Sequence, residues 1–320
     1  MSHPFLSQLS FIQTNQEYRG RFAPSPSGEL HFGSLVAALG SYLQAKQNDG
    51  KWFVRIEDID KPREQQGAVE AILSGLQAFG MQWDIDVQTS HDQKQNHQQC
   101  LVQSQRIARY EQVLNYLISF NRVYACECTR KQIKQSGGVY LGLCKNKQLP
   151  FSLPDNEYSL RLHLPKLIHQ FEDLLHGLVT QSLDTFNEDF IIKRKDQLFA
   201  YQLVVVVDDI DQGITEVVRG ADIMPLTFRQ LSLYQLLGVP APSYLHLPLA
   251  VTKPGFKLSK QNHASGINQQ NPIPELLQAL RFLGLPVFDG LSGDTVDSIM
   301  EWAVQHWQIS LLPKQQEVLI

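Results

Sequence analysis

The chain has 320 residues, of which 43% are hydrophobic and 19% charged, a composition that excludes an intrinsically disordered protein. No apolar run approaches the roughly 18 residues of a membrane-spanning helix, and four cysteines are too few for a secreted disulfide framework. The formal charge of −4 is unlike that of a protein that binds nucleic acid by charge alone.

Strand and helix patterns alternate through the first 120 residues. Short apolar runs predict strands at residues 18–23 and 52–56, and a helix begins near Gly33. A second helix is expected over residues 62–79, where a proline could occupy the first turn, and a third over residues 107–117. This order predicts a parallel sheet whose strands are joined by helices.

The second half of the chain returns to strand-like sequence. Its expected strands are residues 159–164, 190–193, 198–207, 214–218 and 244–250. Its expected helices are residues 226–237, 274–283 and 295–307.

The residues between these halves have a different character. Six basic residues and one acidic residue lie between Asn121 and Lys147, with three of the four cysteines. We therefore predict a Rossmann-like α/β domain with a doubly wound parallel sheet, split by an insertion and followed by a short helical region. The split domain comprises residues 18–120 and 188–262, the insertion comprises residues 121–187, and the C-terminal region comprises residues 263–320. The basic cluster weakens the objection that the overall charge raises against a nucleic-acid partner.

The segment from Arg21 to Ser34 (RFAPSPSGELHFGS) is typical of a strand that ends at a turn before a helix. The free N–H groups at a helix N-terminus bind anions, and Gly33 lets a phosphate approach the backbone closely. His31 is placed to donate a hydrogen bond to a phosphate oxygen. Taken alone, the pattern also fits a histidine that merely caps a helix.

A second segment, Lys257 to Gln261 (KLSKQ), follows a Pro-Gly pair. By itself, such a loop is usually solvated surface. Loops at the carboxyl ends of strands in an open α/β sheet converge on one crevice, however. His31 from one loop and two lysines from the other could therefore surround one triphosphate.

Together these segments resemble the His-x-Gly-His and Lys-Met-Ser-Lys-Ser elements of class I aminoacyl-tRNA synthetases. Their context, with Arg55 to Asp58 (RIED) and Val218 to Asp222 (VRGAD), resembles the glutamyl branch. Ser34 replaces the second histidine, and Gln261 stands where glutamyl enzymes usually carry a basic residue. About 57 residues follow His263, too few for the helical anticodon-binding domain of a full-length glutamyl enzyme. This shortened pattern is similar to the glutamyl-Q tRNA(Asp) synthetase family.

The resemblance implies a ligase that activates L-glutamate with ATP and Mg²⁺ without needing tRNA. It further implies transfer of glutamate to the queuosine base in the anticodon of tRNA(Asp). The catalytic residues implied are His31 and Lys260, and the ATP-binding residues are His31, Gly33, Lys257 and Lys260. The implied glutamate-binding residues are Arg21, Phe22, Ala23, Pro24, Ser25, Glu57, Tyr201 and Arg219.

The chemistry of three of these residues suits the implied substrate. The arginine fork matches two carboxylate oxygens, which favours Arg21 and Arg219 for that contact, and Glu57 would take the substrate ammonium. Without the resemblance, Tyr201 could equally be a core tyrosine in a strand, and Arg219 could form an ordinary surface ion pair.

Cys126, Cys128 and Cys144 suit a structural zinc site because three thiolates lie within 19 positions. Free buried cysteines are the alternative. No histidine lies between the first and last of them, and the resemblance points to Tyr140 as a fourth ligand. Cys100 fits no ligand pattern.

Three other functions stay open. A shortened glutamyl-tRNA synthetase would charge the 3′ end of a tRNA, and a non-catalytic relative would bind tRNA through its basic insertion. Both His31 and Lys260 argue against a pure binder, which needs no triphosphate clamp. A nucleotidyltransferase with the His-x-Gly element would not explain the Arg219 segment. The few cysteines and the absence of a secretory signal predict a cytoplasmic protein, and we expect a monomer without a membrane partner.

Overall fold

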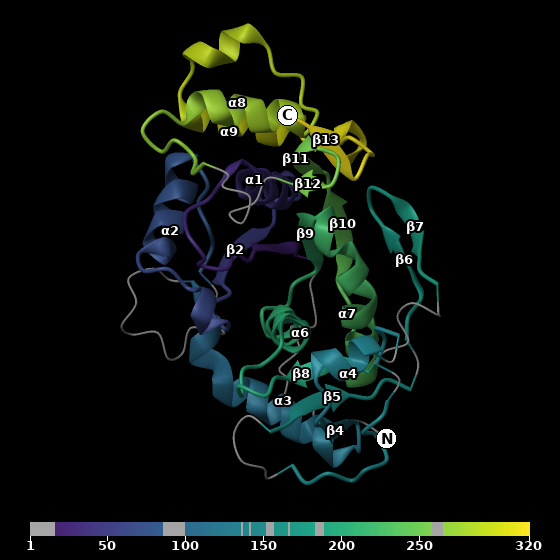
Figure 1. Cartoon of the computed structure of the whole chain (residues 1–320). Coiled ribbons are helices and arrows are strands. Elements are labelled where there is room, and N and C mark those ends of the chain that lie inside the picture. The colour runs from purple at the N-terminus through teal and green to yellow at the C-terminus, as the bar shows by residue number, and fades with distance from the viewer. Residues whose placement is uncertain are drawn as a thin grey trace.

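The computed structural model describes residues 17–85, 100–135, 137–140, 142–151, 157–165, 167–182, 189–257 and 265–320. Within these ranges, two helices lie at one end of the molecule and a small antiparallel sheet lies at the other (Figure 1). None of the helices in these ranges is long and apolar enough to cross a membrane.

The first part of the chain forms parallel strands joined by helices, as the alternating pattern predicts. β1 (Arg19–Phe22) pairs with β2 (Lys51–Ile56), and β2 pairs with the short β3 (Leu101–Val102). The connections run through α1 (Phe32–Gln47) and α2 (Ala68–Ala78).

β9 (Glu216–Gly220) lies on the other side of β1. A main-chain hydrogen bond of 2.9 Å links the residue before β9 to the first residue of β1. β9 pairs in parallel with β10 (Ser243–Leu247), and β10 pairs in parallel with β6 (Gln170–Asp173). β7 (Gly177–Thr180) runs antiparallel to β6, so the strands are mixed rather than purely parallel. The strand order reverses between β1 and β9, and ligands bind at the carboxyl ends of strands at such a reversal.

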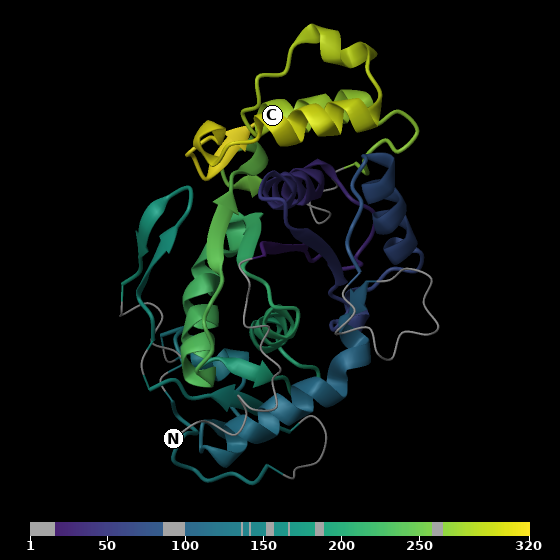
Figure 2. The same cartoon turned by 180° about the vertical axis from the view of Figure 1, so that it is seen from behind.

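A second sheet, entirely antiparallel, contains strands from the expected insertion. β4 (Val123–Cys126), β5 (Ser159–Leu162) and β8 (Ile191–Lys193) lie side by side in it. β8 lies beyond the expected end of the insertion but shares its sheet. α3 (Ile107–Ser119) packs against β4, and α4 (Arg130–Gln135) follows that strand; Figure 2 shows this end from behind.

The apolar run at residues 198–207 is largely helical, so the predicted strand is wrong. α6 (Tyr201–Asp211) contains it, and the side chains from Leu203 to Val207 are all buried. α3 and α7 (Met224–Leu237) pack against α6. A short apolar run without periodicity suits a buried strand and a buried helix equally. Here burial on all sides overrides the β-propensity of the valines.

Two element boundaries also differ from the prediction. Pro62 lies in a separate 3₁₀ turn, and α2 begins only after Gly67, whose φ of +76° lies outside the helical region. The strand expected at residues 244–250 is two strands, β10 and β11 (Leu249–Lys253). Pro248 separates them because proline has no N–H to continue a ladder.

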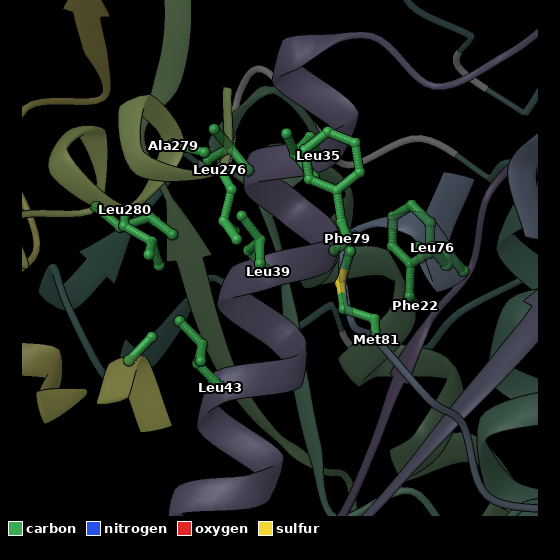
Figure 3. Close-up of a cluster of buried hydrophobic side chains, with 14 of the residues drawn as sticks. Phe22, Leu35, Leu39, Leu43, Leu76, Phe79, Met81, Leu276, Ala279 and Leu280 are labelled. Atoms are coloured by element: carbon green, nitrogen blue, oxygen red, sulfur yellow. The ribbon is translucent and has the colours of Figure 1, made fainter. Parts of the chain in front are cut away.

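The C-terminal helices fix the position of α1. α8 (Ile273–Phe282) and α9 (Val296–His306) match the two expected helices. Figure 3 shows Leu35, Leu39 and Leu43 of α1 in the middle of a cluster. On one side of them lie Leu276 and Leu280 of α8, and on the other side lie Leu76 of α2 and Phe79, which follows α2. Each fully buried leucine contributes about 1.5–3 kcal/mol relative to exposure. α1 is therefore a rigid support for whatever its N-terminus binds.

One strand near the C-terminus has no counterpart in the prediction. β13 (Glu317–Leu319) pairs in parallel with β11. On its other edge, β11 pairs antiparallel with β12 (Phe256–Lys257). The C-terminal residues thus brace the hairpin that leads into the second sequence motif.

Candidate functional site

The N-terminus of α1 forms one wall of a pocket. His31 caps α1: its Nδ1 accepts from the backbone N–H of Ser34 at 3.3 Å, and Ser34 Oγ accepts from the backbone N–H of His31 at 2.7 Å. An accepting Nδ1 places the proton of the neutral ring on Nε2. The pocket has an empty volume of about 550 Å³, its open mouth included, and Gly33, Gly220 and Asp222 also line it. A helix N-terminus, glycines and an imidazole N–H together suit a phosphate group.

The flanks of the second motif both approach this pocket. Lys257 ends β12, which pairs with β11, and two residues of β11 line the pocket. On the other flank, Gly266 forms a β-bridge with His31. A Cβ at Gly266 would lie 2.1 Å from the carboxylate of Glu29, so a larger residue there would force that side chain to move. Lys260 and the side chain of Lys257 lie outside what the structure describes.

A buried charged cluster joins β1, β2 and α6. Asp209 Oδ1 accepts from Arg21 Nε at 3.0 Å and lies 2.8 Å from Arg55 Nη2. Arg55 also donates to Gln212 Oε1 at 2.8 Å, and its Nη2 lies 3.5 Å from Glu57 Oε1. Burial raises the pKa of Glu57 to about 7, against the opposing effect of the two arginines. Burial would raise the pKa of Asp209 too, but the same arginines hold it below its ordinary value.

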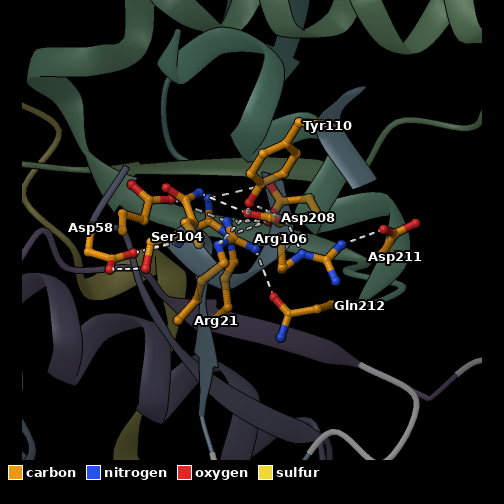
Figure 4. Close-up of polar contacts among 12 residues, drawn as sticks. Arg21, Asp58, Ser104, Arg106, Tyr110, Asp208, Asp211 and Gln212 are labelled. Atoms are coloured by element: carbon orange, nitrogen blue, oxygen red, sulfur yellow. Dashed lines mark hydrogen bonds and ion pairs between the residues drawn. The ribbon is translucent and has the colours of Figure 1, made fainter. Parts of the chain in front are cut away.

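The cluster continues through Asp208, which is fully buried (Figure 4). Asp208 Oδ1 accepts from Arg106 Nε at 2.8 Å and from Tyr110 Oη at 3.0 Å, and Asp208 Oδ2 accepts from Gln103 at 2.8 Å. These contacts tie α6 to α3 and to the residues before it. The C-terminal end of α6, which holds Arg21 and Arg55, is therefore itself held in place.

Arg219, near the end of β9, is also buried, and not all of the nitrogen atoms of its guanidinium group are hydrogen-bonded within the described residues. Its Nε donates to His246 Nε2 at 3.1 Å, and its Nη2 donates to Thr227 Oγ1 at 2.6 Å. Its guanidinium lies 5.0 Å from the centre of the Tyr244 ring. Among the residues that the structure describes, its Nη1 is buried without a hydrogen-bond partner. Such a group is costly unless a ligand completes it.

Tyr201 lies among the charged residues that the sequence singled out. It starts α6 and interacts electrostatically with Arg219, Glu57 and Arg21, and its burial raises its pKa. The fold thus brings together four of the residues expected to bind glutamate, from β1, β9, α6 and the end of β2.

The segment after β1 contributes in another way. Phe22 packs in the hydrophobic core (Figure 3). Its ring is stacked on that of Trp52, with the ring centres 6.4 Å apart. The carbonyl oxygen of Pro24 accepts from the backbone N–H of Glu57 at 2.9 Å. The main chain from Ala23 to Ser25 therefore runs beside Glu57, whereas the Phe22 side chain points into the core.

Sequence reasoning missed several residues that hold the site together: Arg55 as an ion-pair partner, Asp173, Asp208, Asp209, Thr227 and His246. One signal was available for the two aspartates of α6, because charges directly after a buried apolar run need partners. No sequence signal joins Asp173 to His246, which are 73 positions apart.

The cysteine cluster has the geometry of a metal site. The sulfur atoms of Cys126, Cys128 and Cys144 lie within 4.8 Å of one another, and two of them are 3.5 Å apart. A tetrahedral zinc site with bonds of about 2.3 Å has sulfur atoms about 3.8 Å apart. Tyr140 Oη accepts from the backbone N–H of Cys144 at 3.0 Å, beside the thiols. Burial opposes ionisation of Cys126, but hydrogen bonds with Tyr140 and Arg161 lower its pKa overall. The donor set fits a soft cation.

Known proteins resemble this chain in both sequence and fold. Residues 17–288 match the family described as tRNA synthetases class I (E and Q), catalytic domain. The chain is 49% identical to a glutamyl-Q tRNA(Asp) synthetase of Vibrio parahaemolyticus, over 94% of this chain and 96% of the relative. It is 48% identical to one of Shewanella oneidensis, over 97% of each.

The fold also resembles a glutamate tRNA ligase from Elizabethkingia meningosepticum, crystallised with its amino acid. The TM-score is 0.74 at 24% identity. The match covers 94% of this chain but 66% of that chain.

Proposed function

The chain belongs to the glutamyl-Q tRNA(Asp) synthetase family, within the class I tRNA synthetases (E and Q), and from this premise we propose its reaction. It activates L-glutamate with ATP and transfers the glutamyl group to the queuosine base in the anticodon of tRNA(Asp). One observation carries the proposal: the phosphate-suited pocket at α1 adjoins β9, where Arg219 holds a buried Nη1 that has no hydrogen-bond partner among the described residues.

Activation needs no protein nucleophile. An oxygen of the glutamate α-carboxylate attacks the α-phosphorus of ATP, the bond to the bridging oxygen breaks, and pyrophosphate leaves with its electron pair. The residues position the reactants and stabilise charge. His31 donates from Nε2 to the phosphates, Gly33 admits them to the backbone, and Lys257 and Lys260 neutralise negative charge. Mg²⁺ accompanies ATP through phosphate oxygens.

The orientation of bound glutamate follows from the group that must remain free to react. The α-carboxylate must reach ATP, so the γ-carboxylate is the anion left for the arginines. Arg219 offers it Nη1, and Arg21 adds a second positive charge nearby. Glu57 accepts the ammonium, while Tyr201 and the main chain from Ala23 to Ser25 complete the walls.

The transfer step requires tRNA to be held outside this crevice. α4 exposes Arg130, Lys131 and Lys134 in a six-residue helix without an acidic residue. These side chains contact tRNA phosphates in the proposed complex, because Lys and Arg neutralise phosphate without regard to sequence. Lys147 is less available, because its Nζ pairs with Glu127 at 2.5 Å.

The decisive experiment separates activation from transfer. The protein with glutamate, ATP and labelled pyrophosphate, but without tRNA, exchanges label into ATP. With tRNA(Asp), labelled glutamate is incorporated only when queuosine is present, and removal of the 3′-terminal adenosine leaves that incorporation intact. A shortened glutamyl-tRNA synthetase would instead charge the 3′ end and lose acceptance once the terminal adenosine is removed. Absence of exchange by folded protein excludes the enzyme.

Zinc is the metal that the cysteine cluster suits, with Cys126, Cys128 and Cys144 as thiolate ligands and Tyr140 as the fourth. Its role is to cross-link the insertion. Elemental analysis should find about one zinc per chain, and C126S should lose it, with a lower melting temperature. C100S, which removes a buried cysteine outside the cluster, should keep the metal. A metal-free wild-type protein with normal melting contradicts the zinc site.

Glu57 makes glutamate use depend on pH. Its carboxyl has a pKa of about 7 in the free protein, and only the ionised form pairs with the ammonium. We expect kcat/KM for glutamate to fall about tenfold per pH unit below 7, because kcat/KM reports the free enzyme. E57Q should give a low, flat profile, while KM for ATP keeps its wild-type pH dependence. A flat wild-type profile between pH 5.5 and 7 contradicts this role.

The raised pKa of Glu57 also makes folding stability depend on pH, but in the opposite direction to glutamate use. Folded Glu57 keeps its proton up to about pH 7, whereas an unfolded glutamate loses it near 4.5. Its contribution to stability is therefore complete below pH 4.5 and is lost as the pH rises through 7.

A further inference from the structure

Two residues behind Arg219 hold its guanidinium from one side. His246 of β10 and Thr227 of α7 accept from Nε and Nη2, which form one edge of the fork. Thr227 Oγ1 also lies 3.1 Å from His246 Nε2, so its hydroxyl can donate to the ring. With that edge occupied, rotation of the guanidinium would break two hydrogen bonds. The Nη1 end is thereby aimed at one fixed place.

His246 can accept at Nε2 only if its proton is on Nδ1. Asp173 of β6 fixes this, because its Oδ2 lies 2.7 Å from His246 Nδ1 and accepts from the backbone N–H of His246 at 3.2 Å. The other oxygen, Oδ1, accepts from the backbone N–H groups of Leu175 and His176, each at 3.0 Å. The carboxylate is therefore immobilised by four hydrogen bonds, and it sets both the tautomer and the orientation of the ring.

The surroundings keep the ring neutral. The charged or titratable groups that face it are Asp173 from β6, Arg219 from β9, Tyr244 from β10, and His176, whose Nε2 lies 3.0 Å from the His246 carbonyl oxygen. Burial lowers the pKa of His246 to about 4. Near neutral pH the imidazole is thus an acceptor for Arg219 and not a competing cation.

We propose that Asp173 and His246 are a positioning pair that orients Arg219 toward the γ-carboxylate of glutamate and so sets the discrimination between glutamate and glutamine. The inference rests on the proposed function. Its physical basis is that an aimed guanidinium bonds a carboxylate at two oxygens, whereas glutamine presents an amide N–H₂ to the same donors. A loosely held Arg219 could turn away from the amide and would discriminate less.

Two substitutions separate the contacts of His246. H246N keeps a side-chain N–H near the position of Nδ1 for Asp173 but is too short to reach Arg219. H246Q instead carries an acceptor near the position of Nε2. We expect H246N to raise KM for glutamate about 10- to 100-fold, the effect of one lost hydrogen bond to a charged group. The ratio of kcat/KM for glutamate over glutamine should fall as well, and H246Q should restore much of both.

The assay is tRNA-free pyrophosphate exchange, with melting temperature as the folding control and H306L as a remote histidine replacement. KM for ATP should stay within about twofold, since His246 acts through Arg219 alone. In a double-mutant cycle, H246N should cost little once R219L is present. Equal losses for glutamate, glutamine and ATP, or additive effects in the cycle, overturn the positioning role. A wild-type protein without exchange overturns the proposed function itself, and this inference with it.

Discussion

Replacing Arg219 with leucine is expected to lower kcat/KM for glutamate by about two to three orders of magnitude. Truncating one partner of a buried, hydrogen-bonded charge pair costs about 2–5 kcal/mol, and about 1.4 kcal/mol corresponds to a factor of ten. The effect is large because Nη1 is buried and has no other partner within the part of the chain that the structure describes. Pyrophosphate exchange at saturating ATP and varied glutamate measures it.

The fold should survive this substitution. Both direct partners of Arg219, His246 and Thr227, are neutral, so its loss leaves no opposite charge buried alone. R219K keeps the charge without the planar fork and should fall between wild type and R219L. R281L removes an exposed arginine of α8 and should match wild type. Normal kcat/KM in folded R219L would show that the carboxylate binds elsewhere.

Replacing Asp209 should have a large effect on the free energy of unfolding, as replacing Arg219 should have on kcat/KM. D209N leaves the guanidinium groups of Arg21 and Arg55 buried without their shared counter-ion. Breaking a buried pair in this way costs about 3–5 kcal/mol, which is a large part of the 5–15 kcal/mol that typically separates folded from unfolded protein. Urea unfolding at constant pH measures the loss.

A surface pair supplies the matched control. Asp196 pairs with Arg194 at 2.6 Å, and both side chains are more than two-fifths exposed. D196N should therefore change the free energy of unfolding by about 0–1 kcal/mol, as solvent screens exposed pairs. If D209N cost no more than D196N, the buried cluster would not be what holds α6 against β1 and β2.

Local sequence determined the elements wherever periodicity was clear. The helices α1, α3, α8 and α9 and the strands β1 and β2 follow directly from their apolar spacing and caps. The strand predicted for the run that contains Leu203 to Val207 was wrong because four consecutive valines show neither a helical nor a strand period. Only the packing of α3 and α7 around that segment made it a helix.

The residues proposed to contact ligands could be named from the sequence because each belongs to a short contiguous signature. His31, Arg21, Glu57 and Arg219 all lie in such segments, and the fold places the last three, with Tyr201, in one charged region. Lys260 stays a prediction because it lies outside the described residues. So does the zinc ion, although the three thiols are gathered as the cysteine spacing suggested.

The sequence by itself thus determined the α/β class and the family, and it named the residues proposed to meet the substrates, since these depend on patterns within a few tens of residues. Tertiary structure alone decided what holds those residues: Asp209 beneath Arg21 and Arg55, and the Asp173–His246 pair beneath Arg219. Such partners are contributed by different strands and helices. Their proximity depends on the strand order of the sheet, which no local spacing encodes.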